Sequence, residues 1–349
     1  MLATIMYGPG DVRVEERPKP ALVTSGDAIV RVVASCVCGS DLWGYRGVGS
    51  SDEPKEMGHE FIGVVESIGE TVASVSVGDF VISPFTSSDG SCPACLNNMQ
   101  AVCDHLSFFG ADDTNGVHLA GGQGEYVRVP FADGTLVPVP GPVDDALIPS
   151  LLSLSDVMST GHHGAVCAGV GPETSVVVVG DGAVGLSAVL AARRLGATRI
   201  IAMSRNPARQ AVAREFGATD IVEARGREAG AVIRELLGGV LADCVVEAVG
   251  TKESMEQALA SVRPGGRLGY VGVPAGGPEF PIQFLFSKNI AVSGGMAPAR
   301  AYIPELLVDV LSGAINPGLV FDLELPLSEA AEGYRAMDER RAIKALLRP

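Results

Sequence analysis

The chain has 349 residues, which is long enough for about two domains that each bury a core. Hydrophobic residues make up 47% of the sequence and charged residues 19%, so the chain is expected to fold. The net charge of −15 argues against a nucleic-acid partner, because binding to a phosphate backbone needs a basic face.

The sequence gives no sign of a membrane or export segment. Residues 1–20 lack an apolar stretch behind a basic start, so a signal peptide is not expected. No apolar run approaches the roughly 18 residues that span a bilayer. Three of the seven cysteines (Cys92, Cys95 and Cys103) fall within about a dozen residues, a spacing that favours metal binding over disulfides. We therefore expect a cytoplasmic protein without a membrane partner.

Up to about residue 149, short β-like runs alternate with turns rich in glycine, proline and aspartate. This pattern predicts a mostly β domain with long loops. The expected strands are residues 2–7, 12–16, 28–34, 62–68, 80–82 and 126–129.

From about residue 174 to 293, strand-like and helix-like segments alternate. Six short strands separated by helices predict a parallel, doubly wound α/β sheet of the Rossmann type. The expected strands are residues 176–179, 199–203, 220–222, 243–248, 267–271 and 290–293, with helices at 183–195, 207–217, 228–237 and 252–262. Residues 302–311 and 329–338 are expected to form further helices that pack on the first domain or near the coenzyme.

A glycine motif, Gly180-Asp-Gly182-Ala-Val184-Gly185, follows the first of these strands and opens the first helix. In this position the glycines let a pyrophosphate approach the backbone at the N-terminus of a helix. The alternative is a tight strand-to-helix turn that binds nothing. The full alternation of strands and helices around the motif favours a dinucleotide site.

Two short segments supply a thiol and an imidazole, which are ligands that zinc prefers. Cys38 lies in Cys-Gly-Ser-Asp41, and His59 lies in Gly-His-Glu60. Asp41 and Glu60 are candidates for orienting these ligands. The alternatives are a small buried cysteine and a core histidine, and we interpret Cys36, Cys167 and Cys244 in that structural way.

The run from residue 58 to 72, GHEFIGVVESIGETV, resembles the zinc signature of the medium-chain alcohol dehydrogenases, and the similarity extends over essentially the whole chain. The resemblance implies a catalytic zinc held by Cys38, His59 and a third residue that matches Asp156. Many relatives have cysteine there and others aspartate, and either choice gives two negative ligands. Asp156 could alternatively be a helix N-cap.

The resemblance also implies a mechanism. Zinc would keep one coordination position for the substrate oxygen and lower the pKa of an alcohol bound there. Ser40 resembles the hydroxyl that takes the alcohol proton in the family, although it could instead be a turn serine. Many relatives carry a proton-passing histidine where this chain has Trp43, so the outer proton path would use water or the ribose. Trp43 could instead wall the substrate pocket.

A second cysteine-rich segment resembles the structural-zinc lobe of the family. The family usually has four cysteines there, and in this chain the first is replaced by Asp89, ahead of Cys92, Cys95 and Cys103. A carboxylate is an acceptable zinc ligand, so two zinc ions per chain are expected. A water molecule in place of Asp89, or a site without metal, is the alternative.

The resemblance further implies how the chain is organised. A GroES-like catalytic domain would comprise residues 1–157 and 295–349, and a Rossmann domain residues 158–294. The cleft between the two domains would hold zinc, coenzyme and substrate. Thr160, Val184 and Val271 match positions near the nicotinamide, and a homodimer or homotetramer is implied by the family alone.

The end of the second Rossmann strand predicts NADP(H) in preference to NAD(H). An NAD site usually carries an acid there that binds the ribose 2′-hydroxyl, but Ser204 occupies that position. Arg205 follows it and Arg209 lies one turn on, and guanidinium groups suit a phosphate. The alternative is that these arginines form the solvated face of a surface helix.

These observations predict a zinc-dependent alcohol dehydrogenase or carbonyl reductase that acts on a small-molecule alcohol, aldehyde or ketone. One alternative is a double-bond or imine reductase on the same fold, in which zinc is dispensable. Another is a non-catalytic, zinc-stabilised dinucleotide-binding protein. Residues from scattered loops are expected to build the substrate pocket.

Overall fold

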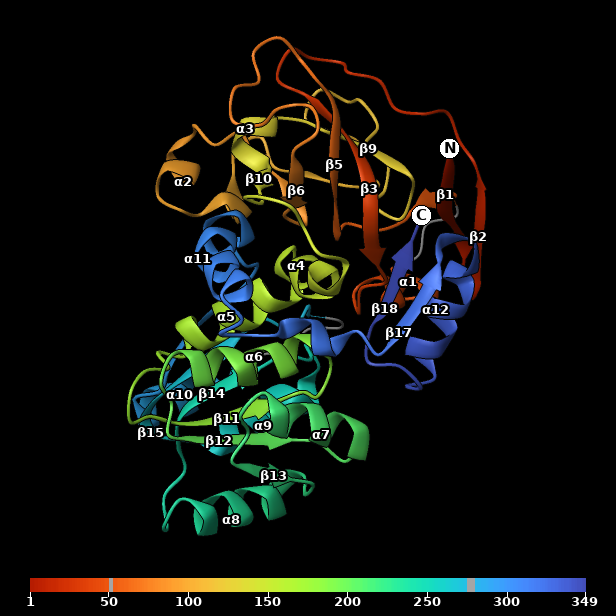
Figure 1. The fold of residues 1–349 in the computed structure, drawn as a ribbon. Helices are drawn as coiled ribbons and strands as arrows, with labels where there is room; N and C mark the ends of the chain where they lie inside the picture. Colours follow the sequence, from red (N-terminus) through yellow and green to blue (C-terminus); the bar gives the residue numbers. More distant parts are fainter. Residues whose placement is uncertain (50–52, 275–279) are drawn as a thin grey trace. The chain divides into compact units, whose positions relative to one another are not determined.

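The computed structural model describes residues 1–49, 53–274 and 280–349. The chain forms two compact units, which are Met1–Ser159 with Pro298–Pro349, and Thr160–Ala297 (Figure 1). The first unit is mostly β and contains both chain ends. The second unit alternates strands and helices. Among the described residues, no helix is both long and apolar enough to cross a membrane.

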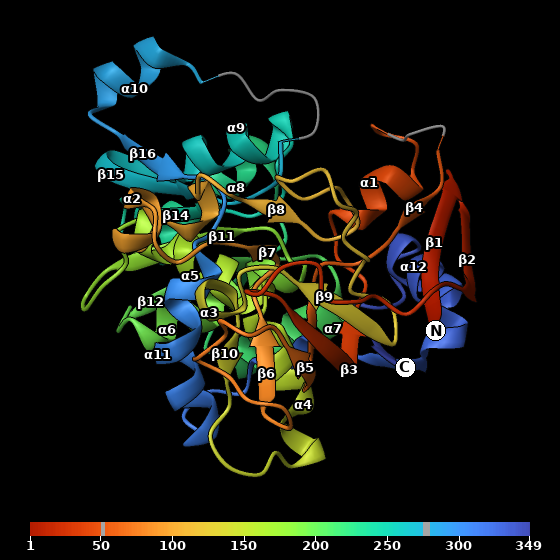
Figure 2. The same ribbon diagram turned by 90° about the horizontal axis from the view of Figure 1, so that it is seen from above.

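The first unit is built around a sheet in the order β10-β6-β5-β3-β18-β17, with β9 also paired to β3. Figure 2 shows β3, β5 and β6 side by side. A sheet in the order β2-β1-β4 and the pair β7-β8 complete the unit. The strands are β1 (Leu2–Gly8), β2 (Asp11–Glu16), β3 (Ala28–Cys36), β4 (Lys55–Glu56), β5 (Phe61–Ile68), β6 (Phe80–Ser83), β7 (Thr86–Ser87), β8 (Ser107–Phe108), β9 (Tyr126–Val129), β10 (Val137–Pro138), β17 (Leu323–Pro326) and β18 (Ala345–Arg348).

Short helices connect these strands. The helix α5 begins in the first unit and continues into the second. The α-helices are α1 (Asp41–Tyr45), α2 (Pro93–Leu96), α3 (Ala132–Thr135), α4 (Ile148–Leu154), α5 (Val157–Cys167), α11 (Ala299–Leu311) and α12 (Ala330–Asp338). The 3₁₀ turns are η1 (Gln100–Val102), η2 (Asp145–Leu147), η3 (Pro317–Val320) and η4 (Leu327–Glu329).

Strand β3 lies in the middle of the main sheet of the first unit and contributes Ala28, Val30 and Val32 to its core. Strand β3 pairs with β5, β9 and β18, and most of its residues are buried. One apolar cluster includes Val30, Phe61 and Val127, and another includes Val37, Tyr334 and Leu347. The loops at the ends of β3 and β5 are therefore held by a rigid sheet.

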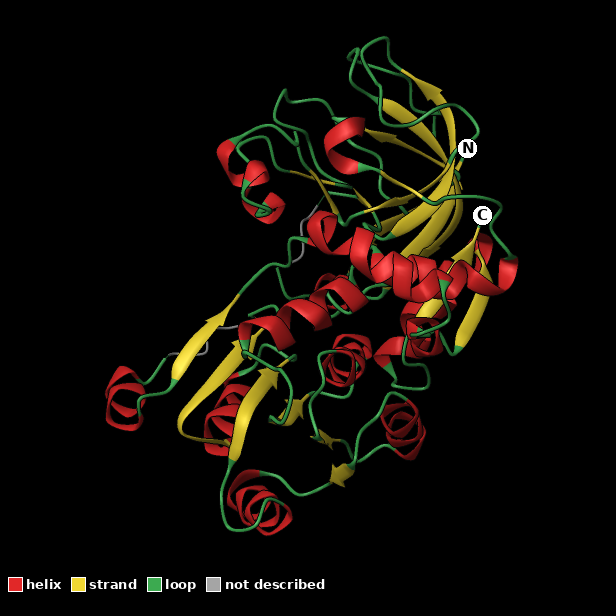
Figure 3. Cartoon of the chain, turned by 60° about the vertical axis from the view of Figure 1, so that its left-hand side comes forward, coloured by secondary structure: helices red, strands yellow, loops and turns green. Residues whose placement is uncertain are grey.

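The second unit is a parallel sheet in the order β13-β12-β11-β14-β15-β16, with helices on both faces (Figure 3). The strand order reverses beside β11, where the carboxyl ends of the strands form the usual ligand crevice of such folds. The strands are β11 (Ser175–Val179), β12 (Arg199–Met203), β13 (Asp220–Val222), β14 (Ala242–Glu247), β15 (Val262–Tyr270) and β16 (Ala291–Gly294). The helices are α6 (Ala183–Arg194), α7 (Pro207–Glu215), α8 (Gly226–Leu236), α9 (Lys252–Ser261) and α10 (Ile282–Lys288).

The observed fold confirms the predicted class, a Rossmann-type parallel sheet together with a mostly β unit. Strands β9, β12 and β13 have the predicted bounds, whereas β15 begins five residues earlier than the predicted residue 267. The helices predicted at 302–311 and 329–338 are present as α11 and α12, but the prediction overlooked β17 and β18, which join the first sheet. These strands are short and carry charged residues, so their pattern resembles that of a surface loop.

Candidate metal and coenzyme sites

Cys38, His59, Glu60 and Asp156 form one cluster in the first unit. Cys38 follows β3, His59 and Glu60 precede β5, and Asp156 directly precedes α5. One ligand atom from each residue lies within 4.8 Å of the others. Asp156 Oδ2 is 3.8 Å from Cys38 Sγ and 3.6 Å from His59 Nε2. The structure thus brings together three predicted ligands that are up to 118 residues apart in the chain.

Asp41 lies on the other side of the His59 ring. Its Oδ1 is 3.7 Å from His59 Nδ1, and its Oδ2 accepts a hydrogen bond from the Cys38 backbone N–H. Gln123 Nε2 donates to the same Asp41 oxygen, and Tyr334 donates to Gln123 Oε1. Both Gln123 and Tyr334 are fully buried. These two partners of Asp41 could not be predicted from the sequence, because neither lies in a recognisable motif.

Glu60 forms an ion pair with Lys344, a residue that no sequence motif marks. Lys344 Nζ lies 2.7 Å from Glu60 Oε1 and donates to the Val37 carbonyl oxygen as well. Among the described residues, no hydrogen-bond donor reaches Glu60 Oε2. This second oxygen is therefore available to another positively charged group.

The electrostatics of the cluster suit a bound cation. Burial by itself lowers the pKa of His59, but Cys38, Asp156 and Asp41 outweigh that effect and raise the pKa well above 6.5. Burial first, and then the charge of Glu60, raises the pKa of the Cys38 thiol. Anionic groups that face one another in a buried site repel, and a divalent cation relieves that repulsion. The thiol, imidazole and carboxylate donors match the ligand preference of zinc.

Ser40 lies between Cys38 and helix α1. Helix α1 begins directly after Ser40. Within the described residues, the Ser40 hydroxyl accepts no capping hydrogen bond from the backbone N–H groups of this helix. Ser40 itself lies in a turn, in which the Asp41 backbone N–H donates to the Cys38 carbonyl oxygen, as the turn-serine alternative expects. Trp43 lies in the same helix, and the guanidinium of Arg46 is 5.9 Å from its ring centre.

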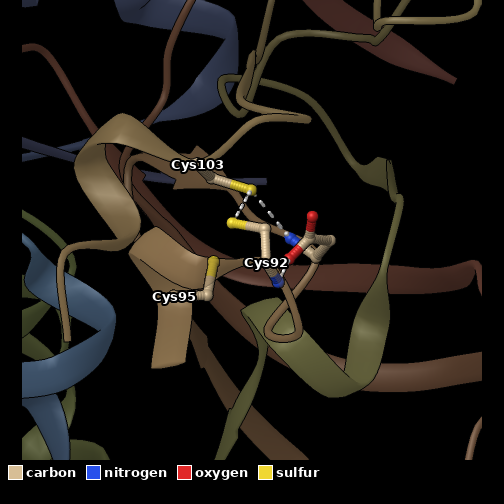
Figure 4. Close-up of side chains that lie close together, drawn as sticks. Cys92, Cys95 and Cys103 are labelled. Atoms are coloured by element: carbon tan, nitrogen blue, oxygen red, sulfur yellow. Dashed lines mark hydrogen bonds between the residues drawn. The ribbon is translucent and has the colours of Figure 1, made fainter. Parts of the chain in front are cut away.

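Asp89, Cys92, Cys95 and Cys103 form a second cluster, also with ligand atoms within 4.8 Å of one another. The three thiols point toward a common centre, and Cys92 Sγ is 3.8 Å from Cys103 Sγ (Figure 4). The backbone N–H groups of Asp89 and His105 each lie 3.3 Å from Cys103 Sγ. Such N–H donors favour a thiolate, so the lobe is arranged for a metal ion.

Asp89 has a partner that the sequence did not reveal. His105 Nδ1 lies 2.7 Å from Asp89 Oδ2, while Asp89 Oδ1 accepts from the N–H groups of Ser91 and Cys92. Burial by itself raises the pKa of Asp89, but these hydrogen bonds outweigh it and hold the pKa well below 3.8. The carboxylate is thus ionised and fixed beside the thiols.

The glycine motif lies between β11 and α6 in the second unit. A Cβ at Gly185 would lie 2.1 Å from the Gly180 carbonyl oxygen, so only glycine fits there. Gly180 has a φ of +124°, which L side chains rarely adopt. At Gly182 a Cβ would meet no atom within 4 Å, so this side of the loop is open to a ligand. The loop geometry therefore fits a pyrophosphate at the N-terminus of α6.

The residues after β12 are arranged around Asp181. Ser204 is fully buried and donates a hydrogen bond of 2.7 Å to Asp181 Oδ2. Arg209 is buried and its Nη1 lies 3.2 Å from Asp181 Oδ1. Arg205 is exposed. Of the three residues predicted to face a 2′-phosphate, only Arg205 faces solvent.

The remaining predicted coenzyme residues lie on elements near the glycine loop. Thr160 is in α5 and Val184 is in α6, and these helices touch at Gly161, where a Cβ would lie 2.5 Å from the Ala188 nitrogen. Val271 is buried directly after β15. Among the other cysteines, Cys36 and Cys244 are buried, and Cys167 lies 3.5 Å from His163 Nε2.

Comparisons with known proteins assign this architecture. Residues 24–141 match the family described as alcohol dehydrogenase GroES-like domain, and residues 183–312 match zinc-binding dehydrogenase. Zinc-type alcohol dehydrogenase B of Aspergillus flavus is 34% identical over all of this chain and 81% of that protein. A probable zinc-binding alcohol dehydrogenase of Mycobacterium tuberculosis is 36% identical over all of this chain and 89% of its own length.

Solved structures give the same result. The alcohol dehydrogenase TADH from Thermus sp. ATN1 superposes with a TM-score of 0.90 at 34% identity and covers 100% of this chain and 99% of its own. A putative zinc-binding dehydrogenase from Sinorhizobium meliloti, bound to NADP, has a TM-score of 0.83 at 26% identity and covers 100% of this chain and 99% of its own.

Fold, clusters and comparisons together define a zinc-type oxidoreductase that acts on a small molecule. The chain belongs to the zinc-dependent medium-chain alcohol dehydrogenase/reductase family, which implies zinc and a nicotinamide coenzyme.

Proposed function

We propose that this protein is a zinc-dependent alcohol dehydrogenase or carbonyl reductase that moves a hydride between an alcohol or carbonyl compound and NADP(H). The observation that carries the proposal is the cluster of Cys38, His59 and Asp156. We assign catalysis to residues 1–157 with 295–349 and coenzyme binding to residues 158–294. The free thiols of the chain suit a reducing cytoplasm.

Cys38, His59 and Asp156 would hold the catalytic zinc. When bound, zinc supplies a Lewis acid for the substrate oxygen, and the nicotinamide supplies the hydride acceptor. Asp41 faces Nδ1 of His59, which leaves Nε2 directed toward Asp156 and the metal position. Glu60, fixed by Lys344, adds a negative charge beside the ligands.

Ser40 would take the proton of the substrate hydroxyl. It lies two residues after a ligand, and helix α1 does not use its hydroxyl as a cap within the described residues. Trp43 replaces the histidine that many relatives use to pass the proton onward. The proton would therefore leave Ser40 through water or the ribose, and the indole of Trp43 would wall a pocket for apolar substrates.

Asp89, Cys92, Cys95 and Cys103 would hold a second, structural zinc. The four donor atoms form a closed set, which is typical of structural rather than catalytic zinc. His105 would orient the carboxylate of Asp89.

The preference for NADP(H) rests on two observations. The turn after β12 contains no acid, and the exposed Arg205 can pair with a 2′-phosphate. Ser204 and Arg209 would contribute only after releasing Asp181, to which both are bound.

We also propose a homodimer or homotetramer. Strand β16 is at the edge of the described six-stranded sheet. The adjacent helix α10 exposes Phe286 by 85% and Ile282 by 69%. An open edge beside apolar side chains is favourable for pairing between copies. Sedimentation of the Phe286→Asp variant tests this proposal, with Val308→Asp as the control at a position that is 65% exposed in the other unit. A wild type that sediments as a monomer contradicts it.

The central experiment follows NAD(P)H absorbance with a panel of alcohols, aldehydes and ketones, with and without a zinc chelator. We expect turnover that the chelator abolishes. Chelator-resistant reduction of carbon–carbon double bonds or imines would instead support the reductase alternative. Coenzyme binding without turnover of any substrate would support the non-catalytic alternative.

A further inference from the structure

Asp181 is the second residue of the glycine motif, a position at which the motif itself requires no particular side chain. Its carboxylate is nevertheless engaged on both oxygens. Ser204 Oγ donates to Oδ2 over 2.7 Å, and Arg209 Nη1 lies 3.2 Å from Oδ1. Arg209 also donates to the Asp181 carbonyl oxygen over 3.3 Å. Asp181 therefore connects the glycine loop to the residues that follow β12.

These contacts change what the residues after β12 can offer a coenzyme. The Ser204 proton points to Asp181, so the hydroxyl is not presented as a donor to a phosphate. The charge of Arg209 is largely offset by the carboxylate, since both side chains are at most 15% exposed. A carboxylate thus lies near the end of β12 and masks the positive charge of Arg209, although the turn of residues 204–206 contains no acid.

We propose that Asp181 is the residue that discriminates against a 2′-phosphate in this protein. A carboxylate has about four acceptor positions, so a ribose hydroxyl can join or replace the donors that Asp181 already binds. Its pairing with the guanidinium of Arg209 and with the Ser204 hydroxyl withholds both groups from a phosphate at the same place. Asp181 thereby supplies from the glycine loop the acid that NAD sites usually place at the end of the second strand. This inference rests on the proposed binding of a nicotinamide coenzyme to the second unit.

The inference is compatible with a net preference for NADP(H). Arg205 would attract the 2′-phosphate and Asp181 would oppose it, and the sum of the two effects sets the preference. The opposite role for Asp181 is to hold Ser204 and Arg209 in place for a phosphate. The two roles predict opposite outcomes when the carboxylate is neutralised.

The test is the Asp181→Asn variant, which keeps the size of the side chain and an acceptor for Ser204 but removes the charge. Two probes that differ only in the 2′-phosphate, adenosine 5′-monophosphate and adenosine 2′,5′-bisphosphate, are titrated by calorimetry. We expect the affinity ratio to shift by about tenfold toward the bisphosphate, because neutralising Asp181 leaves the positive charge of Arg209 uncompensated. This readout requires neither substrate nor turnover.

Asp220→Asn is the matched control. It removes a carboxylate that pairs with Arg199 in the same sheet. Arg199 begins β12, whereas Ser204 follows the end of that strand. The affinity ratio of Asp220→Asn should equal that of the wild type, and all variants should unfold cooperatively. If the affinity ratio of Asp181→Asn is unchanged, or shifts toward the monophosphate, the proposed role of Asp181 is overturned, but the proposed coenzyme function is not. A wild type that binds neither probe overturns both this inference and the proposed coenzyme function.

Discussion

The ammonium group of Lys344 lies 2.7 Å from the carboxylate of Glu60, and neither side chain is more than 1% exposed. The two residues are 284 positions apart, so the pair joins β18 to the segment that carries His59. Burial by itself lowers the pKa of Lys344, but Cys36, Glu60 and Cys38 outweigh it and raise the pKa well above 10.5. Lys344 therefore stays charged and fixes Glu60 beside the proposed zinc ligands.

Lys344→Met should destabilise the protein strongly, because it leaves the buried charge of Glu60 without its partner. The loss of one member of a buried pair typically costs about 3–5 kcal/mol. The double variant Glu60→Gln with Lys344→Met should recover most of this loss, since no uncompensated charge remains. Denaturant unfolding of the zinc-loaded proteins measures both effects. A single variant as stable as the wild type would contradict the structural role of the pair.

Purified protein should contain two zinc ions per chain. Asp156→Ala should remove the first and abolish turnover, because it deletes a ligand of the proposed catalytic site. Cys92→Ser should remove the second and lower the melting temperature, because structural zinc contributes directly to folding free energy. Elemental analysis and thermal unfolding measure the two outcomes. One metal or fewer per chain in the wild type, unchanged by added zinc, would rule out the two-site proposal.

Ser40→Ala should lower kcat by a factor of about 10²–10⁴, the usual range for a lost proton-transfer group. Coenzyme affinity should not change, because the hydroxyl belongs to the proposed proton path. Ser40→Thr retains a hydroxyl and is the matched control. The effect is measured in single turnovers, under conditions in which hydride transfer limits the rate. Normal turnover of Ser40→Ala there would show that another group takes the proton.

The acid sensitivity of the first unit should depend on Asp113. Burial by itself raises the pKa of Asp113, but hydrogen bonds from Arg128, Val117 and Asn115 outweigh it and lower the pKa below 3.8. A carboxylate with a depressed folded-state pKa stabilises the fold above its unfolded pKa, and the contribution disappears as pH falls through the folded value. Asp113→Asn should thus be less stable than the wild type at pH 7, by about 1–3 kcal/mol.

The difference between wild type and Asp113→Asn should shrink as pH falls below about 4, because protonation then removes the same charge from the wild type. Urea unfolding across pH 7 to 3 measures it. Asp112→Asn is the control, since the Asp112 side chain is 69% exposed and pairs only at the surface with His118. A gap that stays constant with pH would mean that Asp113 acts through packing rather than charge.

Local sequence patterns predicted the features that local physics determines. The glycine loop, the strands β9, β12 and β13, and the Cys92–Cys95–Cys103 spacing could all be recognised within short windows. The partners of the site residues could not. Lys344 reaches Glu60, and Tyr334 and Gln123 reach Asp41, only because β18, α12 and β3 pack together in the folded unit.

The same limit affected the coenzyme residues. The sequence showed that the turn after β12 contains no acid. It did not show that Asp181, in the glycine loop after β11, contacts Ser204 and Arg209. An aspartate at the second position of the glycine motif was the one sequence signal that could have revealed this contact. The position of a carboxylate in space, rather than along the chain, determines what a coenzyme meets.

The last prediction is that the wild type has a higher kcat/KM with NADP(H) than with NAD(H), and that Arg205→Ala reduces or reverses the difference. Arg205 is exposed after β12, and a guanidinium can bind a phosphate through two hydrogen bonds. Loss of one charge-assisted contact of this kind should lower NADP(H) affinity by about tenfold or more and leave NAD(H) nearly unchanged. Steady-state kinetics and coenzyme titration with both forms measure the effect.

Arg214→Ala is the matched control for this prediction, because Arg214 is an exposed arginine near the C-terminal end of α7, the helix that follows Arg205. It should leave both coenzymes unaffected, which separates a specific contact from the general loss of one positive charge in an acidic chain. A wild type that favours NAD(H) would show that the carboxylate of Asp181 outweighs Arg205. An Arg205→Ala variant with unchanged NADP(H) affinity would place the 2′-phosphate away from Arg205 altogether.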